Sequence, residues 1–206
     1  KTDIVSGKKS NPFFNVVYLS VGNGDSSLIT LPYNKGNILI DTGGLYNYEI
    51  VKNKTIPYLM SLGITKVDYL ITTHGDYDHM GEAINLVNNF KVEKVIFNCG
   101  EFNELEQDLI KALDKKKIPY YSCIKELNID GNKLYFLNDK DYDNENDNSS
   151  VVYMKFNNHK FLFMGDAGVE VEEDLIEELS FSLSFSLSYS TVFKNCNLYS
   201  SIFNSL

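Results

Sequence analysis

Two of the three histidines in this 206-residue chain lie five residues apart, in the segment Thr73-His74-Gly75-Asp76-Tyr77-Asp78-His79. An apolar run at 66–73 leads into the segment and predicts a buried strand, so the polar side chains should lie where α/β folds bind ligands. Imidazole nitrogens and carboxylate oxygens suit a divalent cation such as zinc or manganese. In a turn, His74 and Asp76 could share one ion while Asp78 and His79 face a second. A polar loop with a capping aspartate is the alternative, and four candidate ligands within six positions favour the metal site.

Strands and helices are expected along most of the remaining chain. Turn residues separate three short apolar runs near the N-terminus, which predicts consecutive strands in a meander. The expected strands cover 13–19, 26–31, 37–41, 66–73, 94–98, 151–156 and 160–165, with a hairpin over 127–137 around Asp130-Gly131. Helices are expected over 55–62, 81–89, a segment capped by Asn103 and Glu106, and 170–179. This order predicts a layered α/β (α+β) protein.

The chain changes composition at Ser180. Residues 180–206 contain one charged residue, Lys194, and no Gly or Pro, and 180–187 alternate Ser with Phe or Leu. The alternation predicts an amphipathic edge strand, and a shifted reading frame is the alternative interpretation. We therefore divide the chain into an irregular lead-in at 1–12, a folded domain at 13–179 and a low-complexity tail at 180–206.

The overall charge limits the choice of partners. The formal net charge is −9, so the chain should not attract nucleic acid unless cations supply the positive charge. No run reaches the roughly 20 apolar residues of a transmembrane helix, and no protein partner is evident. Cys99, Cys123 and Cys196 are too few and too scattered for a disulfide framework or a cysteine-based zinc site.

The histidine segment resembles the H-x-D-x-D-H motif of metallo-β-lactamase-fold proteins, in the form found in the soluble domain of ComEC-type competence proteins. Three further segments agree with that branch in the same order. They are Val21-Gly22-Asn23-Gly24-Asp25, Leu39-Ile40-Asp41-Thr42-Gly43-Gly44, and Asn148-Ser149-Ser150-Val151-Val152 followed by a strand that ends in Gly165-Asp166. The resemblance covers about 14–179 and implies a four-layer αββα sandwich.

The resemblance also implies roles for the matching residues. His74 and Asp76 would bind a first metal ion, Asp78 and His79 a second, and Asp166 would bridge the two. Asp78 would also act in catalysis by orienting the attacking water. Asp41 ends a strand, and we expect it to hydrogen-bond the turn, with contact to substrate or support of the ligands as the alternatives.

Three departures from the family pattern bear on the expected metal and substrate contacts. Asp76 replaces the second histidine of the wider family, and a harder oxygen ligand favours manganese or a weaker zinc site. Asn148 and Ser150 stand in the region of another family histidine, and we regard them as candidates for contacting substrate or supporting the ligands. No histidine follows Asp166, although the competence-type branch has one, so we expect the C-terminal part of the fold to be incomplete.

By resemblance, the leading hypothesis is a hydrolase with one or two divalent metal ions (Zn or Mn) that acts as a phosphodiesterase or nuclease on DNA. Hydrolysis of a small ester or phosphoester is one alternative. A shortened, inactive chain that only binds metal is the other. The chain begins with Lys rather than Met, so we expect a processed or shortened protein. Together with the family, this suggests an extracellular or membrane-associated location.

Overall fold

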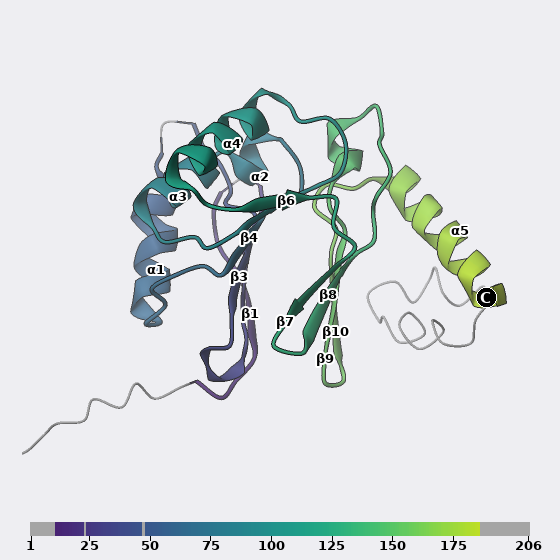
Figure 1. Ribbon diagram of the computed structural model, residues 1–206, viewed down its shortest axis with the longest axis horizontal. Coiled ribbons are helices and arrows are strands. Elements are labelled where there is room, and N and C mark those ends of the chain that lie inside the picture. Colours follow the sequence, from purple (N-terminus) through teal and green to yellow (C-terminus); the bar gives the residue numbers. More distant parts are fainter. Residues whose placement is uncertain (1–10, 23, 47, 186–206) are drawn as a thin grey trace, which may run out of the picture.

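Two β-sheets stacked against each other form the centre of the computed structural model, which describes residues 11–22, 24–46 and 48–185 (Figure 1). The first sheet has the order β1-β2-β3-β4-β5-β6, antiparallel from β1 to β3 and parallel from β3 to β6. Its strands are β1 Asn15–Tyr18, β2 Ser27–Thr30, β3 Asn37–Ile40, β4 Tyr69–Ile71, β5 Val95–Phe97 and β6 Tyr120–Ser122. The predicted N-terminal meander is confirmed.

The second sheet is antiparallel and has the order β10-β9-β8-β7. Its strands are β7 Glu126–Ile129, β8 Asn132–Phe136, β9 Val152–Phe156 and β10 His159–Phe163. β7 and β8 form the hairpin predicted around Asp130-Gly131. His159 begins β10 and is exposed.

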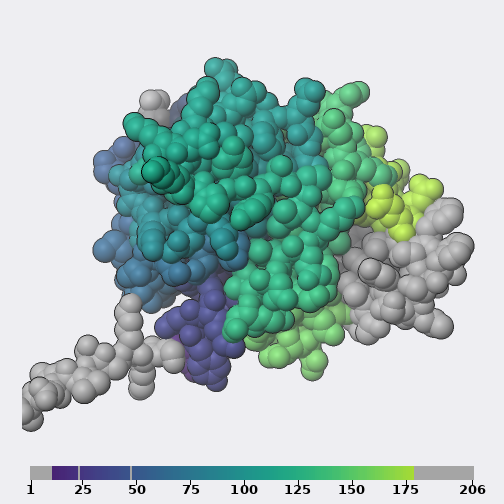
Figure 2. Space-filling view, viewed as in Figure 1, coloured from purple at the N-terminus to yellow at the C-terminus, as the bar shows by residue number. Residues whose placement is uncertain are grey.

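Side chains alternate between the two faces of each strand, and this alternation creates two apolar layers. One face of the first sheet packs on helices, and the other packs on the second sheet. The helix-side cluster includes Leu28, Leu39, Leu70, Val95, Leu86, Leu109 and Leu113. The cluster between the sheets includes Ile29, Ile38, Ile40, Ile71, Ile96, Leu134, Phe136, Val152 and Met154. Figure 2 shows the teal and green parts of the chain in continuous contact on one face of the molecule.

Helices cover the outer face of the first sheet, and one further helix lies on the side of the second sheet (Figure 1). The helices are α1 Ile56–Ser61, α2 Tyr77–Met80, α3 Ala83–Asn89, α4 Glu104–Lys116 and α5 Val169–Phe185. A π-helical turn, Val51–Thr55, precedes α1. The capping box of α4 is confirmed, because Asn103 Oδ1 accepts from two backbone N–H groups and the Glu106 carboxylate accepts from Asn103 N–H.

α5 corrects the expectation of an edge strand over 180–187, because the backbone of 180–185 is helical. No Gly or Pro interrupts the helix that begins at Val169. A helix also satisfies its own backbone hydrogen bonds, which an isolated strand cannot do. Residues 1–10 and 186–206 lie outside the described residues, as do Cys196 and most of the segment for which a shifted reading frame was considered.

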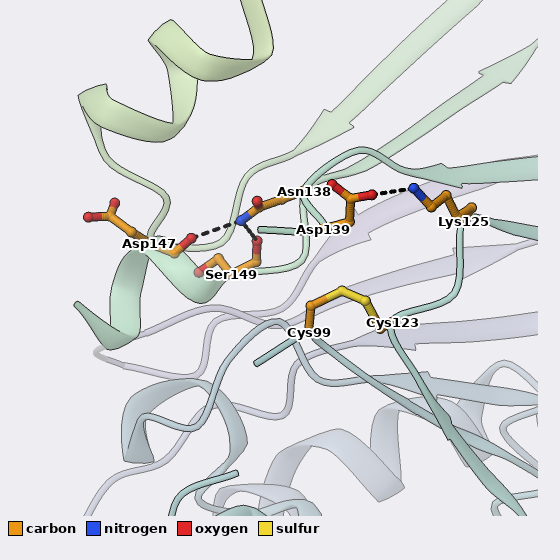
Figure 3. The surroundings of a disulfide bond; sticks show 7 residues. All are labelled: Cys99, Cys123, Lys125, Asn138, Asp139, Asp147 and Ser149. Carbon is orange, nitrogen blue, oxygen red and sulfur yellow. Dashed lines mark hydrogen bonds and ion pairs between the residues drawn. A yellow bond between two sulfur atoms is a disulfide. The ribbon is translucent and has the colours of Figure 1, made fainter. Parts of the chain in front are cut away.

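A disulfide joins Cys99 and Cys123 (Figure 3). Cys99 follows β5 and Cys123 follows β6, and the parallel pairing of these strands brings the two Cα atoms to 4.4 Å. The cysteines are 24 residues apart, so their spacing in the sequence does not predict the bond. Within the described part of the chain, no helix is both long enough and apolar enough to cross a bilayer.

Candidate metal centre

The histidine segment follows β4 at the carboxyl end of the parallel strands, as the sequence predicts, and its last three residues, Tyr77, Asp78 and His79, already belong to α2. Both histidine side chains are almost completely buried, with 0% of His74 and 1% of His79 exposed. Their ring centroids are 4.3 Å apart. Buried polar atoms are rarely left without a hydrogen bond, so the partner of each ring nitrogen shows what that nitrogen can do.

The partners of His74 leave its Nε2 free to bind a ligand. Thr73 Oγ1 lies 3.1 Å from His74 Nδ1 and donates its only proton to Asp41 Oδ2 at 2.6 Å. Thr73 Oγ1 can therefore only accept from His74, which favours the tautomer with the imidazole proton on Nδ1; Ser149 Oγ, also 3.1 Å from Nδ1, can accept from the same proton. Nε2 then carries a lone pair, is buried, and has no hydrogen-bond partner among the described residues.

Burial lowers the pKa of His74, and the charge of His79 lowers it further. The carboxylates of Asp41, Asp76 and Asp166 act in the opposite direction without reversing the shift. His74 is therefore neutral near pH 7, which is the form that binds a metal ion.

His79 is oriented by Asp41. His79 Nδ1 lies 3.0 Å from Asp41 Oδ2, while its Nε2 lies 3.1 Å from Asp166 Oδ1. Burial by itself lowers the pKa of His79, but the hydrogen bond that its Nδ1–H donates to Asp41 and the nearby carboxylates raise this pKa to about 9. A cation that binds Nε2 must therefore displace a proton, and Asp41 holds the ring in position for that exchange.

Asp41 combines a strained backbone with a fully used side chain. Its φ of 57° lies in the left-handed region, and its carboxylate accepts from the backbone N–H and the hydroxyl of Thr73 as well as from His79. It is 1% exposed and bonded to Thr73 and His79, so it is not free to make the contact with substrate that was one of the expectations from the sequence.

Asp166 reaches the histidines from the second sheet. It follows β10, and its backbone N–H donates to Ser149 Oγ at 3.1 Å. Its carboxylate does not cap α5, because α5 begins at Val169 and the N–H of Gly168 donates to Asp147 Oδ1. The carboxylate points instead to His79 and is 41% exposed, so it faces both the ligands and solvent.

Asp76 and Asp78 lie at the edge of this centre. Asp76 Oδ2 is 3.7 Å from His74 Nε2, beyond hydrogen-bonding distance, and its side chain is 45% exposed. The charge of Asp78 contributes to the raised pKa of His79, so Asp78 lies near that ring. The described residues that converge on one point are His74, His79 and Asp166, and the assignment of Asp76 and Asp78 as ligands stays a prediction.

The loop between the first two predicted ligands is held from both sides. Gly75 N–H donates to Glu145 Oε1 at 2.7 Å, and Gly75 C=O accepts from Asn103 Nδ2 at 2.9 Å. Asn103 also caps α4, so one side chain connects that helix to the ligand loop. The sequence identified the cap but gave no sign of its second role.

In the segment Asn148-Ser149-Ser150, the side chain that contacts His74 is Ser149, whereas the sequence had pointed to Asn148 and Ser150. Asn148 holds the backbone of Tyr142 through both atoms of its amide, and Ser150 N–H donates to Thr73 C=O at 2.7 Å. Ser149 Oγ instead lies 3.1 Å from His74 Nδ1. The Asn138 amide donates to the carbonyl oxygens of Asp147 and Ser149, which fixes this segment near the disulfide (Figure 3).

Asp25 is a further residue near the site, and it was not predicted from the sequence. Desolvation raises its pKa, as do the charges of Asp41, Asp166 and Asp78, while His79 lowers it. Its loop approaches α2 closely, because a Cβ at Gly24 would overlap the carbonyl oxygen of Asp78. Gly24 also has a φ of 82°, so this turn needs glycine for two reasons.

The donor atoms fit a divalent cation. One atom each from His74, His79 and Asp166 lie within 4.8 Å of one another, two of them buried and one reachable from solvent. Two imidazole nitrogens and a carboxylate oxygen form a ligand set suited to zinc or manganese. The unpartnered Nε2 of His74 is the specific evidence for a missing ligand, since buried polar atoms are rarely left unpaired.

Comparison with known proteins gives a consistent result. The model of the Metallo-beta-lactamase superfamily matches residues 19–193. ComE operon protein 3 of Bacillus subtilis (strain 168) is 27% identical over 175 residues, which are 77% of this chain and 23% of that protein. The chain thus spans about a quarter of the length of this curated relative.

Solved structures with partial similarity include a possible metal-dependent hydrolase and a metallo-beta-lactamase. A possible metal-dependent hydrolase from Veillonella parvula DSM 2008 has a TM-score of 0.49 and 13% identity, over 82% of this chain and 68% of that one. The metallo-beta-lactamase IND-7 has a TM-score of 0.46 and 18% identity, over 87% and 80% of the two chains.

Proposed function

The chain belongs to the Metallo-beta-lactamase superfamily, a family of metal-dependent hydrolases, and on this basis we propose that it hydrolyses phosphodiester bonds, with DNA as the substrate class. The resemblance of four motifs to the competence-type branch supports this choice of substrate. The similarity to ComE operon protein 3 supports it as well. Because the match covers 23% of ComE operon protein 3, the proposal concerns hydrolysis alone and no other activity of that longer protein.

The observation that supports the proposal most strongly is the convergence of His74, His79 and Asp166. These residues come from the two sheets, and Asp166 is separated from the histidine segment by more than 80 residues. Their polar atoms meet at the edge where both sheets end, with one carboxylate open to solvent. A structural ion pair would not need a second, neutral histidine with an unpartnered nitrogen.

A bound cation would also offset the repulsion between the negatively charged protein and a phosphodiester. The chain carries a net charge of −9, and carboxylates surround the site, so a phosphodiester would be repelled from it. When bound, one or two divalent ions would supply positive charge against the phosphate and make water a better nucleophile near pH 7. Asp76 adds an oxygen ligand where the wider family has histidine, and this favours manganese or a weaker zinc site.

The residues of the chain divide the remaining work. His74 and His79 present Nε2, because Thr73 and Asp41 hold the Nδ1 atoms. Asp78 would orient the attacking water and accept its proton. Asp166 would hold the cation from the side of the second sheet, which makes the site depend on correct packing of the two sheets.

The test is hydrolysis by the purified protein with Mn²⁺ or Zn²⁺, of bis-p-nitrophenyl phosphate and of single-stranded DNA. We expect the protein to hydrolyse both substrates. EDTA should abolish this activity, and Asp78→Asn should lower its rate at least tenfold. Asp108→Asn, on the exposed surface of α4, is the matched control and should leave the rate unchanged. Turnover of carboxylic esters or phosphomonoesters without phosphodiesters would refute the proposed substrate class. No turnover of any of these by a folded, metal-loaded sample would favour a chain that only binds metal.

A further inference from the structure

Tyr77, which stands within the histidine segment, forms a stacked pair with Tyr46 that the proposed chemistry does not use. The rings of Tyr46 and Tyr77 are 4.3 Å apart between centroids, with an interplanar angle of 1°. Tyr77 stands in the metal motif between Asp76 and Asp78. Its neighbours in the sequence are the two predicted aspartate ligands, and its Cα lies within about 4 Å of each of theirs.

The inner ring of the pair has a rigid base. A Cβ at Gly81 would lie 2.9 Å from two atoms of the Tyr77 ring, and a Cβ at Gly44 would lie 2.9 Å from a third. The ring of Tyr77 therefore lies directly against the backbone at two glycines. Tyr77 is half-buried there, and any larger residue at either glycine would push its ring away.

The outer ring presents a free face. Tyr46 is 74% exposed although one side of its ring is covered by Tyr77, so the opposite side faces solvent. The chain reverses direction here, because Tyr48 N–H donates to Leu45 C=O at 3.1 Å across an isolated bridge. An aromatic ring that is stacked on one face and open to solvent on the other suits a flat ligand.

We infer that Tyr46, supported by Tyr77, stacks on a nucleobase of a single-stranded nucleic acid whose phosphodiester is held at the metal centre. The inference rests on the proposed function and specifies which part of the substrate is recognised besides phosphate. Stacking favours single strands, because the bases of a duplex already stack on each other. It also suits a chain with a net charge of −9, since a neutral ring attracts a base without requiring a positively charged groove.

The size of the effect follows from the nature of the contact. Alanine replacement of one stacking aromatic residue typically weakens binding by about 5- to 100-fold. A tyrosine that is already held in place loses little conformational freedom on binding, so the upper half of this range is expected. Because every base has a flat face, the preference should be for the presence of a base and not for its identity.

Binding is measured by fluorescence polarisation, with fluorescein-labelled hexamers joined by phosphorothioate linkages, which resist hydrolysis. One hexamer carries thymine bases, and the other has abasic spacers with the same linkages, each with Mn²⁺-loaded protein. Tyr46→Ala should weaken binding of the thymine hexamer about 10- to 100-fold and leave the abasic hexamer unchanged. Tyr46→Phe keeps the ring and should bind as the unaltered protein does.

Tyr33→Ala is the matched control. Tyr33 is 61% exposed and lies before β3, at the opposite end of the strand from the site, so its loss should change neither affinity. Equal binding of the two hexamers by the unaltered protein would overturn the inference, and so would equal weakening of both by Tyr46→Ala. Hydrolysis of DNA without an effect of Tyr46→Ala removes the stacking site alone. Selective, Tyr46-dependent binding without any hydrolysis removes the proposed function alone.

Discussion

An Asp41→Asn substitution should weaken metal binding although Asp41 is not a predicted ligand. Asp41 Oδ2 accepts from the Thr73 hydroxyl at 2.6 Å and faces His79 Nδ1 at 3.0 Å, while Oδ1 accepts from Thr73 N–H at 2.8 Å. Asparagine has the same shape and can keep the bond to Thr73 N–H. It then places an NH₂ group where Oδ2 was, and this group can only donate.

The change reaches both histidines. Against an NH₂ donor, His79 Nδ1 must accept, which moves the ring proton to Nε2 and blocks the atom expected to bind metal. The Thr73 hydroxyl, which would now accept from residue 41, is free to donate to His74 Nδ1, and this favours the same tautomer in His74. One substitution thus disfavours the binding form of two ligands.

The expected loss can be set against known cases. Removing the group that supports a single metal-binding histidine lowers metal affinity about 10- to 100-fold. Because two histidines depend on Asp41, we expect about 100-fold, or about 2.8 kcal/mol at 1.4 kcal/mol for each factor of ten. The fold should persist, because asparagine tolerates the positive φ of 57° at this position.

The assay is isothermal titration calorimetry of the metal-free protein with Zn²⁺ and with Mn²⁺. Asp68→Asn is the matched control, because Asp68 Oδ2 also accepts a backbone N–H beside β4, at 2.8 Å from Asn37 N, and lies at the other end of that strand. Its affinity should equal that of the unaltered protein. An Asp41→Asn affinity within about threefold of the control would refute the argument that Asp41 sets both tautomers.

Three further outcomes are expected. Burial raises the pKa of Glu106 to about 7, so the folded state holds a proton that the unfolded state loses above its pKa near 4.5. The protonated carboxyl therefore stabilises the fold below pH 4.5, and this stabilisation is lost as the pH rises from 4.5 to about 7. Glutamine does not ionise, so over this interval the free energy of unfolding of Glu106→Gln, measured in urea, should rise by up to about 3 kcal/mol relative to the unaltered protein. A difference between the two proteins that does not change with pH would contradict this. His79→Ala should abolish the bound metal measured by elemental analysis, whereas the exposed His159→Ala should keep it, and equal metal content would remove His79 from the site. Gly24→Ala should destabilise by at least about 2 kcal/mol more than Gly131→Ala, which has a similar φ of 85° but nothing within 4 Å of its Cβ, and equal losses would show that the contact with α2 is unimportant.

Local patterns in the sequence predicted most of the elements. The turn at Asp130-Gly131 and the capping box at Asn103 are short-range signals, and both are confirmed. β6 was not predicted, because its three residues are all exposed and show no alternation of apolar and polar side chains. α2 was missed because a helix of four residues is too short to show a period.

Part of the candidate site was predictable, because the sequence shows which polar residues follow the ends of strands. A strand that ends in Gly165-Asp166 suggested a carboxylate at the sheet edge, and Asp166 lies there beside His79. The choice between Ser149 and Ser150 depends on which of them faces His74, and a shift of one residue exchanges the two. The role of Asp41 and the disulfide depend on contacts between separate segments, which no local pattern contains.

The most direct test of the account is anomalous diffraction from crystals of the protein loaded with Mn²⁺ or Zn²⁺. We expect an anomalous peak about 2.0–2.2 Å from Nε2 of His74, Nε2 of His79 and a carboxylate oxygen of Asp166. Asp76 or Asp78 should complete the coordination of this ion or hold a second one. A fully loaded crystal whose metal lies elsewhere, with His74 Nε2 still without a partner, would contradict the central claim.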